Sequence, residues 1–393
     1  MAQNRIASID VLRALTMLLM IWVNDFWSLI DIPKWLQHAS ATEDYLGFSD
    51  IIFPLFLFIV GLSIPYAIAV RKKKGDSNGA IAKHVIIRSI SLLIIGVYMV
   101  NFESINHDST SIGKQWWEIL MALAVVLIWM NWKRSPLPKK MHIPIQLVGL
   151  GILIWLAVIY KGGTNGDVWM KTQWWGILGL IGWAYLLNGL VFLYGKGKLA
   201  VIFGLFVLLN ILVVLSHSDL LPKLPKHLSF LGVWYGGTVP VFTTGGILAT
   251  LLFQKLFINK SKSIVSVLTL IGIICICYGL LMRPYWGISK IQGTPAWVGI
   301  CLGIGFISFA VLYVICDVKK HTKWATIISP AGTATLTCYM IPYFVYPIAI
   351  LLNIDFPDFL NTGVVGLVGS FVFALLVVLL VGWFQKKGFS LKL

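Results

Sequence analysis

The segment Ser49-Asp-Ile-Ile-Phe-Pro-Leu-Phe-Leu-Phe-Ile-Val-Gly-Leu-Ser63 joins an acidic residue to a long apolar run. The run is typical of a helix that crosses a membrane, and Asp50 stands at its beginning, twelve positions after His38. An ionisable side chain at a membrane edge costs free energy unless it is paired, hydrated or used in chemistry. His38 and Asp50, which enclose one short loop, therefore form a candidate functional site.

The composition excludes a soluble globular domain. Of 393 residues, 58% are hydrophobic and 12% are charged, and the mean hydropathy is +0.87. A membrane-spanning helix needs about 20 apolar residues. The sequence therefore predicts an all-α, polytopic transmembrane helical bundle with about 10–12 spans, and one integral-membrane domain over residues 1–393. The predicted spans are residues 8–30, 48–70, 85–102, 115–132, 143–160, 174–194, 199–215, 238–257, 264–282, 297–316, 325–350 and 363–384.

Two of these spans are interrupted, and the count of ten or eleven stays open for that reason. Residues 85–102 contain Arg88, and residues 325–350 contain three prolines and a glycine. The first span carries Asp10 and Arg13 and has no small-residue cleavage site, so it is predicted to be a retained helix and not a signal peptide.

The distribution of basic residues predicts the orientation. If the N-terminus is cytoplasmic, the loops on that side hold most of the lysines and arginines, as the positive-inside rule requires. Both termini are then cytoplasmic, and His38 and Asp50 face outside. This placement also explains the net charge of +16 without nucleic-acid binding. The cytoplasmic basic runs are Arg71-Lys-Lys-Lys74, Lys133-Arg134, Lys139-Lys140, Lys319-Lys320 and Lys386-Lys387.

Asn24, His38 and Asp50 are the candidate catalytic residues. Asn24 closes the first span and Asp50 opens the second, so a two-helix hairpin can bring them together with His38 in the loop between. A neutral imidazole can take a proton from an attacking amine or attack a thioester itself. A carboxylate can fix the imidazole tautomer, and an amide can donate to an oxyanion. The alternative is that His38 is a solvated loop residue and Asp50 an N-cap.

The predicted cytoplasmic side holds a candidate phosphate site. Arg13 lies three positions after Asp10, so an ion pair between them is one interpretation. Arg13 could also join Arg88 and the basic run that begins at Arg71 and Lys72, because guanidinium and ammonium groups suit phosphate oxygens. Most lysines of that run can equally be topology determinants.

No metal site or disulfide framework is expected. The five cysteines all lie in or at the ends of predicted spans, and their spacing fits neither arrangement. The chain also has no Walker loop. Tryptophans gather near the predicted outer ends of the spans, Trp297 among them. They form either an interfacial aromatic belt or a platform on which a sugar stacks.

The sequence resembles the bacterial relatives of heparan-α-glucosaminide N-acetyltransferase, which belong to a transmembrane acyltransferase superfamily. The likeness covers most of the chain and is most specific near the N-terminus. It rests on Ser8-Ile-Asp10-x-x-Arg13, Ile21-Trp-Val-Asn24-Asp25, His38, Asp50-Ile-Ile-Phe-Pro, Arg88-x-x-x-Leu-Leu-Ile-Ile-Gly, Gly287-Ile-Ser-Lys290 with Trp297, and Ala331-Gly-Thr-Ala-Thr.

This resemblance implies transfer of an acetyl group from cytosolic acetyl-CoA to a glucosamine-type amino sugar, heparan-derived in relatives. The acceptor would lie on the outer side of a bacterial inner membrane. The family's catalytic histidine falls on His38, which acts as general base or nucleophile, with Asp50 and Asn24 beside it. The expected partners are acetyl-CoA, a saccharide and the lipid bilayer, without nucleic acid, and a homodimer is a candidate assembly. The predicted acetyl-CoA contacts are Arg13, Arg71, Lys72, Arg88, Lys290 and Trp297.

The sequence also departs from the family. Ala14 follows Arg13 where glycine is frequent, and residues 39–47 form a longer segment than in the eukaryotic form. The second difference concerns the loop that would face the acceptor. Two other functions therefore stay open: a multi-span transporter of sugars or small molecules without covalent chemistry, and an O-acyltransferase that acts on envelope polysaccharide.

Overall fold

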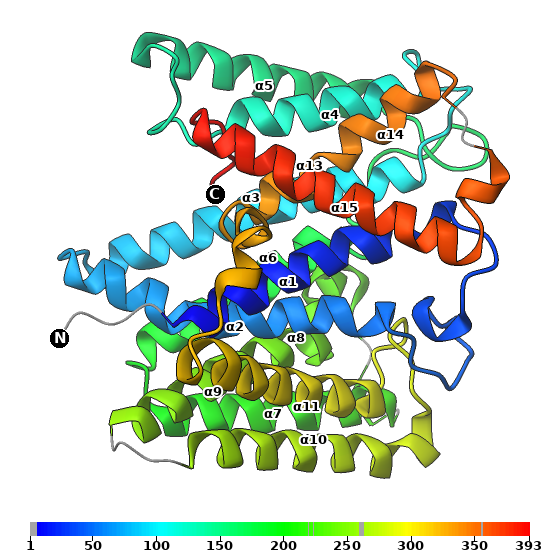
Figure 1. Cartoon of the computed structure of the whole chain (residues 1–393). Helices are drawn as coiled ribbons and strands as arrows, with labels where there is room; N and C mark the ends of the chain where they lie inside the picture. Colours follow the sequence, from blue (N-terminus) through cyan, green and yellow to red (C-terminus); the bar gives the residue numbers. More distant parts are fainter. Residues whose placement is uncertain (1–5, 219, 223, 259–262, 355–356) are drawn as a thin grey trace. The chain divides into compact units, whose positions relative to one another are not determined.

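The computed structural model describes residues 6–218, 220–222, 224–258, 263–354 and 357–393 (Figure 1). Within these residues the chain is helical and contains no β-strand beyond isolated bridges. The α-helices are α1 (Ala7–Asn24), α2 (Ser49–Lys73), α3 (Asn78–Glu103), α4 (Lys114–Trp129), α5 (Lys139–Ile159), α6 (Gly176–Tyr194), α7 (Leu199–His217), α8 (Gly232–Tyr235), α9 (Thr238–Ile258), α10 (Ile264–Trp286), α11 (Pro295–Leu312), α12 (Ser329–Thr333), α13 (Thr335–Met340), α14 (Pro342–Leu351) and α15 (Gly363–Lys386).

Ten helices in the described part of the chain are long and apolar enough to cross a membrane. This confirms the all-α polytopic bundle and the lower end of the predicted range of spans, and the chain is an integral membrane protein. Two predicted spans differ from the helices that the structure contains. The run 115–132 becomes α4, which has only 16 residues. The run 325–350 is divided among α12, α13 and α14.

Proline explains the division of the run 325–350. Pro330 and Pro342 lie in the first turns of α12 and α14. A proline at the start of a helix is tolerated, but within a continuous helix it removes a hydrogen bond and clashes with the preceding turn. Ala334, between α12 and α13, has φ −130° and ψ 47°, outside the helical region. The apolar composition therefore gives three short helices and not one span.

The described chain forms two compact units, each made of segments distant in the sequence. Unit 1 comprises Met1–Thr16, Pro33–Ile90 and Leu180–Thr326, and unit 2 comprises Met17–Ile32, Ser91–Gly179 and Ile327–Leu393. Three of the five boundaries fall within helices, one each in α1, α3 and α6. The single acyltransferase domain over residues 1–393 stays a prediction.

In unit 1, α2 packs against α9 and α11, α9 packs against α7, and α10 packs against α11 (Figure 1). Small residues allow α2 and α9 to approach closely, because a Cβ atom at Gly61 would overlap the Thr243 carbonyl. Two threonines hold the pair together across the interface. Thr243 Oγ1 donates to the Leu57 carbonyl at 3.1 Å, and Thr250 Oγ1 donates to the Leu62 carbonyl at 3.0 Å. This packing fixes α2, whose first turn carries Asp50.

In unit 2, α4 packs against α5 and α14, and α15 packs against α12 and α13 (Figure 1). Trp117 anchors α4, because its side chain is fully buried and its ring lies 6.0 Å from that of Tyr98 and 6.5 Å from that of Phe102. Its indole Nε1 donates to the Leu156 carbonyl at 3.2 Å, as a buried indole requires. The anchored Trp117 fixes the orientation of its neighbour Glu118.

Candidate functional site

His38 and Asp50 are in direct contact in unit 1. The distance from His38 Nδ1 to Asp50 Oδ1 is 2.7 Å. Oδ2 of Asp50 accepts the backbone N–H groups of Ala39 at 3.0 Å and Gly47 at 3.2 Å. The Asp50 side chain is 1% exposed, whereas that of His38 is 44% exposed. The site therefore combines a buried, fully hydrogen-bonded carboxylate with an imidazole that solvent can reach.

The loop before α2 folds so that this contact forms. Phe48 N–H donates to the Trp35 carbonyl at 2.7 Å, and Ser49 Oγ donates to the Leu36 carbonyl. Gly47 is required where the loop passes Gln37, because a Cβ atom there would overlap the Gln37 carbonyl. Asp50 is the second residue of α2, and Phe48 occupies the N-cap position. Asp50 therefore bonds the loop beside its helix and is not the N-cap of the alternative interpretation.

Lys290 joins the pair from a segment 252 positions away. Its Nζ lies 3.1 Å from His38 Nδ1 and 3.8 Å from Asp50 Oδ1. Burial lowers the pKa of Lys290, and the nearby Asp50 carboxylate acts in the opposite direction. Trp297 contacts the same place, because its Nε1 donates to the Asp50 carbonyl at 3.2 Å. Two of the predicted acetyl-CoA contacts, Lys290 and Trp297, thus lie at the histidine.

The segment that carries Lys290 is shaped by a glycine and a capping threonine. Gly287 ends α10 with φ 64°, a conformation that favours glycine. Thr294 caps α11 by accepting the Trp297 N–H, and Pro295 follows at the first helical position. The Thr294 hydroxyl also donates to the Gly287 carbonyl at 2.9 Å, which closes the turn. The turn holds Lys290 beside His38.

One acidic residue, Asp44, ties the loop 39–47 to the same segment, and sequence reasoning missed it. Asp44 accepts from Arg283 Nε at 2.9 Å and from the Ile288 N–H at 2.7 Å. Burial favours the neutral acid, but these hydrogen bonds outweigh it and hold the pKa of Asp44 below its usual value. Gln292 Nε2 donates to the Ala41 carbonyl at 2.8 Å. The only sequence signal was an acidic residue in a loop of an acid-poor chain.

The neighbours of His38 Nδ1 define two tautomers. If Nδ1 carries the proton, it donates to Asp50. If Nδ1 is unprotonated, it accepts from Lys290. In the tautomer bonded to Asp50, Nε2 holds the free lone pair, and no described residue forms a hydrogen bond with it. The geometry therefore suits Nε2 as a proton acceptor or nucleophile.

The basic residues Arg13, Arg71 and Lys72 lie further along α2 or against it. Arg13 forms a 3.2 Å ion pair with Asp10 and donates to Ser63 Oγ at 2.6 Å. Arg71 pairs with Asp76 at 3.0 Å, and Lys72 is exposed. At 1.5 Å per residue, Ser63 and Arg71 lie roughly 20 and 30 Å from Asp50 along the helix. The predicted acetyl-CoA contacts therefore occur in separate places.

Arg88 is placed against an aromatic ring. Its guanidinium carbon lies 4.7 Å from the ring centre of Tyr185. Its Nε is buried without a hydrogen-bond partner among the described residues. A guanidinium in this position retains donors for an added anion.

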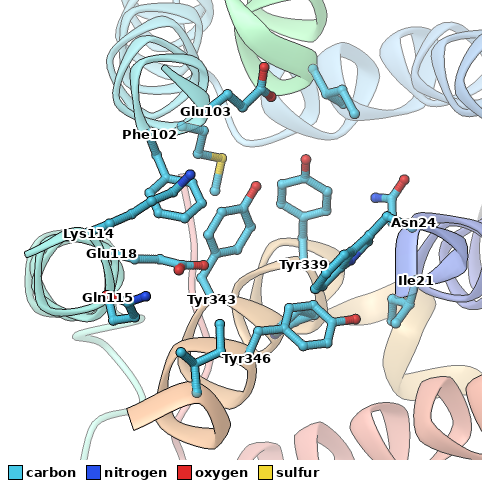
Figure 2. A pocket seen from close by; sticks show the side chains of 15 residues that line it. Ile21, Asn24, Phe102, Glu103, Lys114, Gln115, Glu118, Tyr339, Tyr343 and Tyr346 are labelled. Carbon is cyan, nitrogen blue, oxygen red and sulfur yellow. The ribbon is translucent and has the colours of Figure 1, made fainter. Parts of the chain in front are cut away.

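Asn24 belongs to unit 2, where it lines a pocket of about 760 Å³ (Figure 2). Sequence analysis had not singled out the charged members of this pocket, Glu103, Lys114 and Glu118. The lining residues are Ile21, Asn24, Trp27, Met99, Phe102, Glu103, Lys114, Gln115, Glu118, Ile177, Tyr339, Pro342, Tyr343, Tyr346 and Ile350.

Metal-ligating side chains are not clustered in the part of the chain that the structure describes. No group of three or more His, Cys, Asp or Glu residues is arranged there to hold an ion. The five cysteines are free thiols.

Comparison with known proteins gives one family. Residues 5–144 match the family model described as heparan-alpha-glucosaminide N-acetyltransferase, catalytic. This region includes Asn24, His38 and Asp50. The heparan-alpha-glucosaminide N-acetyltransferases of Mus musculus and Homo sapiens are each 31% identical to the chain, over 102 and 101 residues. These alignments cover 25% of this chain and 14% of each relative, about one seventh of its length. Residues 5–144 of this chain are therefore similar to the catalytic region of the heparan-alpha-glucosaminide N-acetyltransferases.

Proposed function

We propose that this protein is a membrane acyltransferase that moves an acetyl group from acetyl-CoA to the amine of a glucosamine-type sugar. The observation that carries the proposal is the contact between His38 and the buried Asp50 within the region that matches the family. The relatives' name supplies the acceptor class, a glucosaminide whose amine becomes N-acetylated. The basic residues of unit 1 support acetyl-CoA as the donor, because they can bind its phosphate groups.

His38 is the proposed catalytic residue and Asp50 its positioning residue. In direct transfer, the acceptor nitrogen attacks the thioester carbonyl carbon while Nε2 takes the proton from that nitrogen. The carbon–sulfur bond then breaks, and the sulfur leaves with its electron pair and receives the proton. In the two-step alternative, Nε2 attacks the thioester carbonyl carbon, the carbon–sulfur bond breaks and the CoA sulfur leaves with its electron pair. The amine then attacks the acetyl-imidazole, the bond to Nε2 breaks with its electron pair returning to Nε2, and the amine proton passes to Nε2. Asn24 is proposed to hold the acyl carbonyl or the acceptor.

The proposed sidedness follows from α2. Its 25 residues span roughly 37 Å, more than the approximately 30 Å of bilayer hydrocarbon. Asp50 lies in the first turn, and Arg71 and Lys72 lie in the last. We place the basic end and both termini in the cytoplasm by the positive-inside rule. His38 then faces outside, in a bacterial inner membrane.

The proposed donor site combines Arg13, Arg71, Lys72 and Arg88 as contacts for the phosphates of acetyl-CoA. Arg88 supports this most directly, since its Nε has no partner among the described residues. Lys290 and Trp297 lie at His38 and are proposed to contact the acetyl end. We also propose a homodimer, and this part of the proposal rests on the family resemblance alone.

The test is acetyl transfer by the full chain purified in detergent, with labelled acetyl-CoA and glucosamine. We expect His38→Ala to lower kcat/KM by roughly 10²–10⁴-fold, the usual contribution of a positioned acid–base group. His107→Ala is the matched control. His107 is also an exposed loop histidine with an aspartate 3.3 Å away, and its variant should keep full activity. Undiminished turnover by His38→Ala would refute the proposed role.

A transporter is the second candidate, and one observation favours it. The helices α12, α13 and α14 form an interrupted run, as is common in transporter binding sites. A transporter would move labelled glucosamine across a vesicle membrane without acetyl-CoA and without acetylating it. An O-acyltransferase would instead label hydroxyl groups of a polysaccharide. Acetylated product from glucosamine, with no uptake of the free sugar, would favour the N-acetyltransferase over both.

A further inference from the structure

The pocket of unit 2 has the size and lining of a small-molecule site. Its volume of about 760 Å³ is within the usual range of ligand pockets. Figure 2 shows that the rings of Phe102, Tyr339, Tyr343 and Tyr346 surround the open space. Several of these rings are held in place. Tyr346 donates its hydroxyl to Asp25 Oδ1 at 2.6 Å, and its ring lies 5.6 Å from that of Trp27. The walls are therefore largely preformed.

Glu118 is a buried carboxylate without a direct partner. The residue is 7% exposed, and among the described residues it forms no hydrogen bond or ion pair. Figure 2 shows its carboxylate directed into the pocket, beside Tyr343. It cannot move aside easily, because the adjacent Trp117 is fully buried and packed against Tyr98 and Phe102. A buried carboxylate charge with no partner is costly, so Glu118 either holds a proton or pairs with a cation from outside the protein.

Lys114 does not supply that cation. It lies four positions before Glu118 on α4, and its Nζ is 4.7 Å from the ring centre of Phe102. No ion pair joins Lys114 to Glu103 or Glu118 within 4.0 Å among the described residues. Its charge acts on Glu118 only at longer range. The pocket thus contains two carboxyl groups and one ammonium group, so a carboxyl group there can hold a proton or meet a further cation.

This combination selects the chemistry of the occupant. An anion would be repelled by an ionised Glu118, and an apolar molecule would offer Glu118 neither a charge nor a hydrogen bond. A protonated amine would pair with Glu118 and also be attracted to the aromatic faces. A ring attached to that amine would fill the apolar space between the tyrosines.

We propose that the pocket of unit 2 binds a small ring-shaped molecule that carries a protonated primary amine, with Glu118 as its counter-ion. An amino sugar has this chemistry. Identifying the occupant with the acetyl acceptor rests on the proposed function, whereas amine binding at Glu118 does not. Asn24 and Gln115, which also line the pocket, supply amide groups for the hydroxyls of such a ring.

The first test compares three sugars on the wild-type full chain in detergent, without acetyl-CoA. Calorimetric titration should show that glucosamine binds at least tenfold more tightly than glucose or N-acetylglucosamine, which share the ring but lack the cation. Carboxyl labelling with a diazo reagent, read by mass spectrometry, should show that glucosamine protects Glu118 and glucose does not. Equal binding of the three sugars, or no protection of Glu118, would overturn the proposal.

Variants then assign the effect to Glu118. Glu118→Gln should weaken glucosamine binding by roughly tenfold to a hundredfold, the usual effect of losing a charged partner. Asp108→Asn removes a 98% exposed carboxylate from the same unit and should bind as the wild type does. Unchanged binding by Glu118→Gln would also overturn the proposal. His38→Ala should still bind glucosamine, so a failure of the proposed acetyl transfer is distinguishable from a failure of this site.

Discussion

Asp50 in unit 1 and Glu118 in unit 2 are both buried carboxylates, but their surroundings differ. Asp50 is 1% exposed and accepts hydrogen bonds from two backbone amides while contacting His38 and Lys290. Glu118 is similarly buried and has no direct partner among the described residues. A satisfied carboxylate stabilises the loop that holds it, whereas an unsatisfied one is kept at a cost. The comparison separates a carboxylate whose partners are already in place, the proposed positioning residue of His38, from a carboxyl group for which we propose a ligand as partner.

The largest expected effect is on Asp50. Asp50→Asn keeps the size of the side chain but removes the charge that Lys290 and the backbone amides face. We expect kcat/KM for acetyl transfer to fall by roughly 10²–10⁴-fold, because His38 loses its orienting partner. The free energy of unfolding should fall by about 3 kcal/mol. Transfer assays and thermal unfolding in detergent measure both. If Asp50→Asn were fully active and as stable as the wild type, the hydrogen bonds of Asp50 would not distinguish it from Glu118.

Glu118→Gln should change stability less, and in the other direction. Because Glu118 has no direct partner, neutralising it removes a buried charge without breaking a hydrogen bond. We expect the free energy of unfolding to be unchanged or to rise by about 1 kcal/mol in the absence of ligand. Denaturant unfolding of this variant and the wild type is the measurement. A loss as large as that in Asp50→Asn would show that Glu118 has a structural partner.

The smallest expected effect concerns Asp44, which anchors the loop to Arg283. The folded-state pKa of Asp44 is lowered, so the stability it contributes is present above its unfolded pKa of about 4. That contribution is lost as the pH falls through the lower folded pKa. Asp44 is partly exposed, so Asp44→Asn should cost about 1 kcal/mol or less at pH 7.

Thermal unfolding from pH 7 down to about pH 3 tests this dependence. The difference between Asp44→Asn and the wild type should shrink over the acidic part of the range. A difference that stays constant with pH would mean that the Asp44 charge does not hold the loop.

The fold was predictable to the extent that composition determines it. Long apolar runs become helices whatever their neighbours are, since a bilayer leaves backbone polar groups no other partner. The prediction was wrong where local chemistry intervened. Pro342 begins α14 where a continuous span was predicted, and the non-helical Ala334 separates α12 from α13. The run at 115–132 gives a helix of only 16 residues. The prolines that interrupt the run 325–350 were visible in the sequence, but the division of this run into three short helices was not.

The candidate site was predictable only where its residues are close in sequence. His38 and Asp50 are separated by one loop, so the spacing alone placed them within reach. The role of Lys290 was not readable, because its contact with His38 depends on a turn set by Gly287 and Thr294, 252 positions away. Glu118 was hidden inside an apolar run. Only the packing of Trp117 shows that its carboxylate faces a pocket.

The sequence by itself determined the membrane class, the helical content and the pairing of a histidine with an aspartate before α2. These properties depend on composition and on short-range spacing, which can be read from the sequence without knowing the fold. The tertiary structure alone decided which distant groups complete each site. Lys290 is brought to His38, and Glu118 has no partner among the described residues, because tertiary packing sets the position of each buried ionisable group.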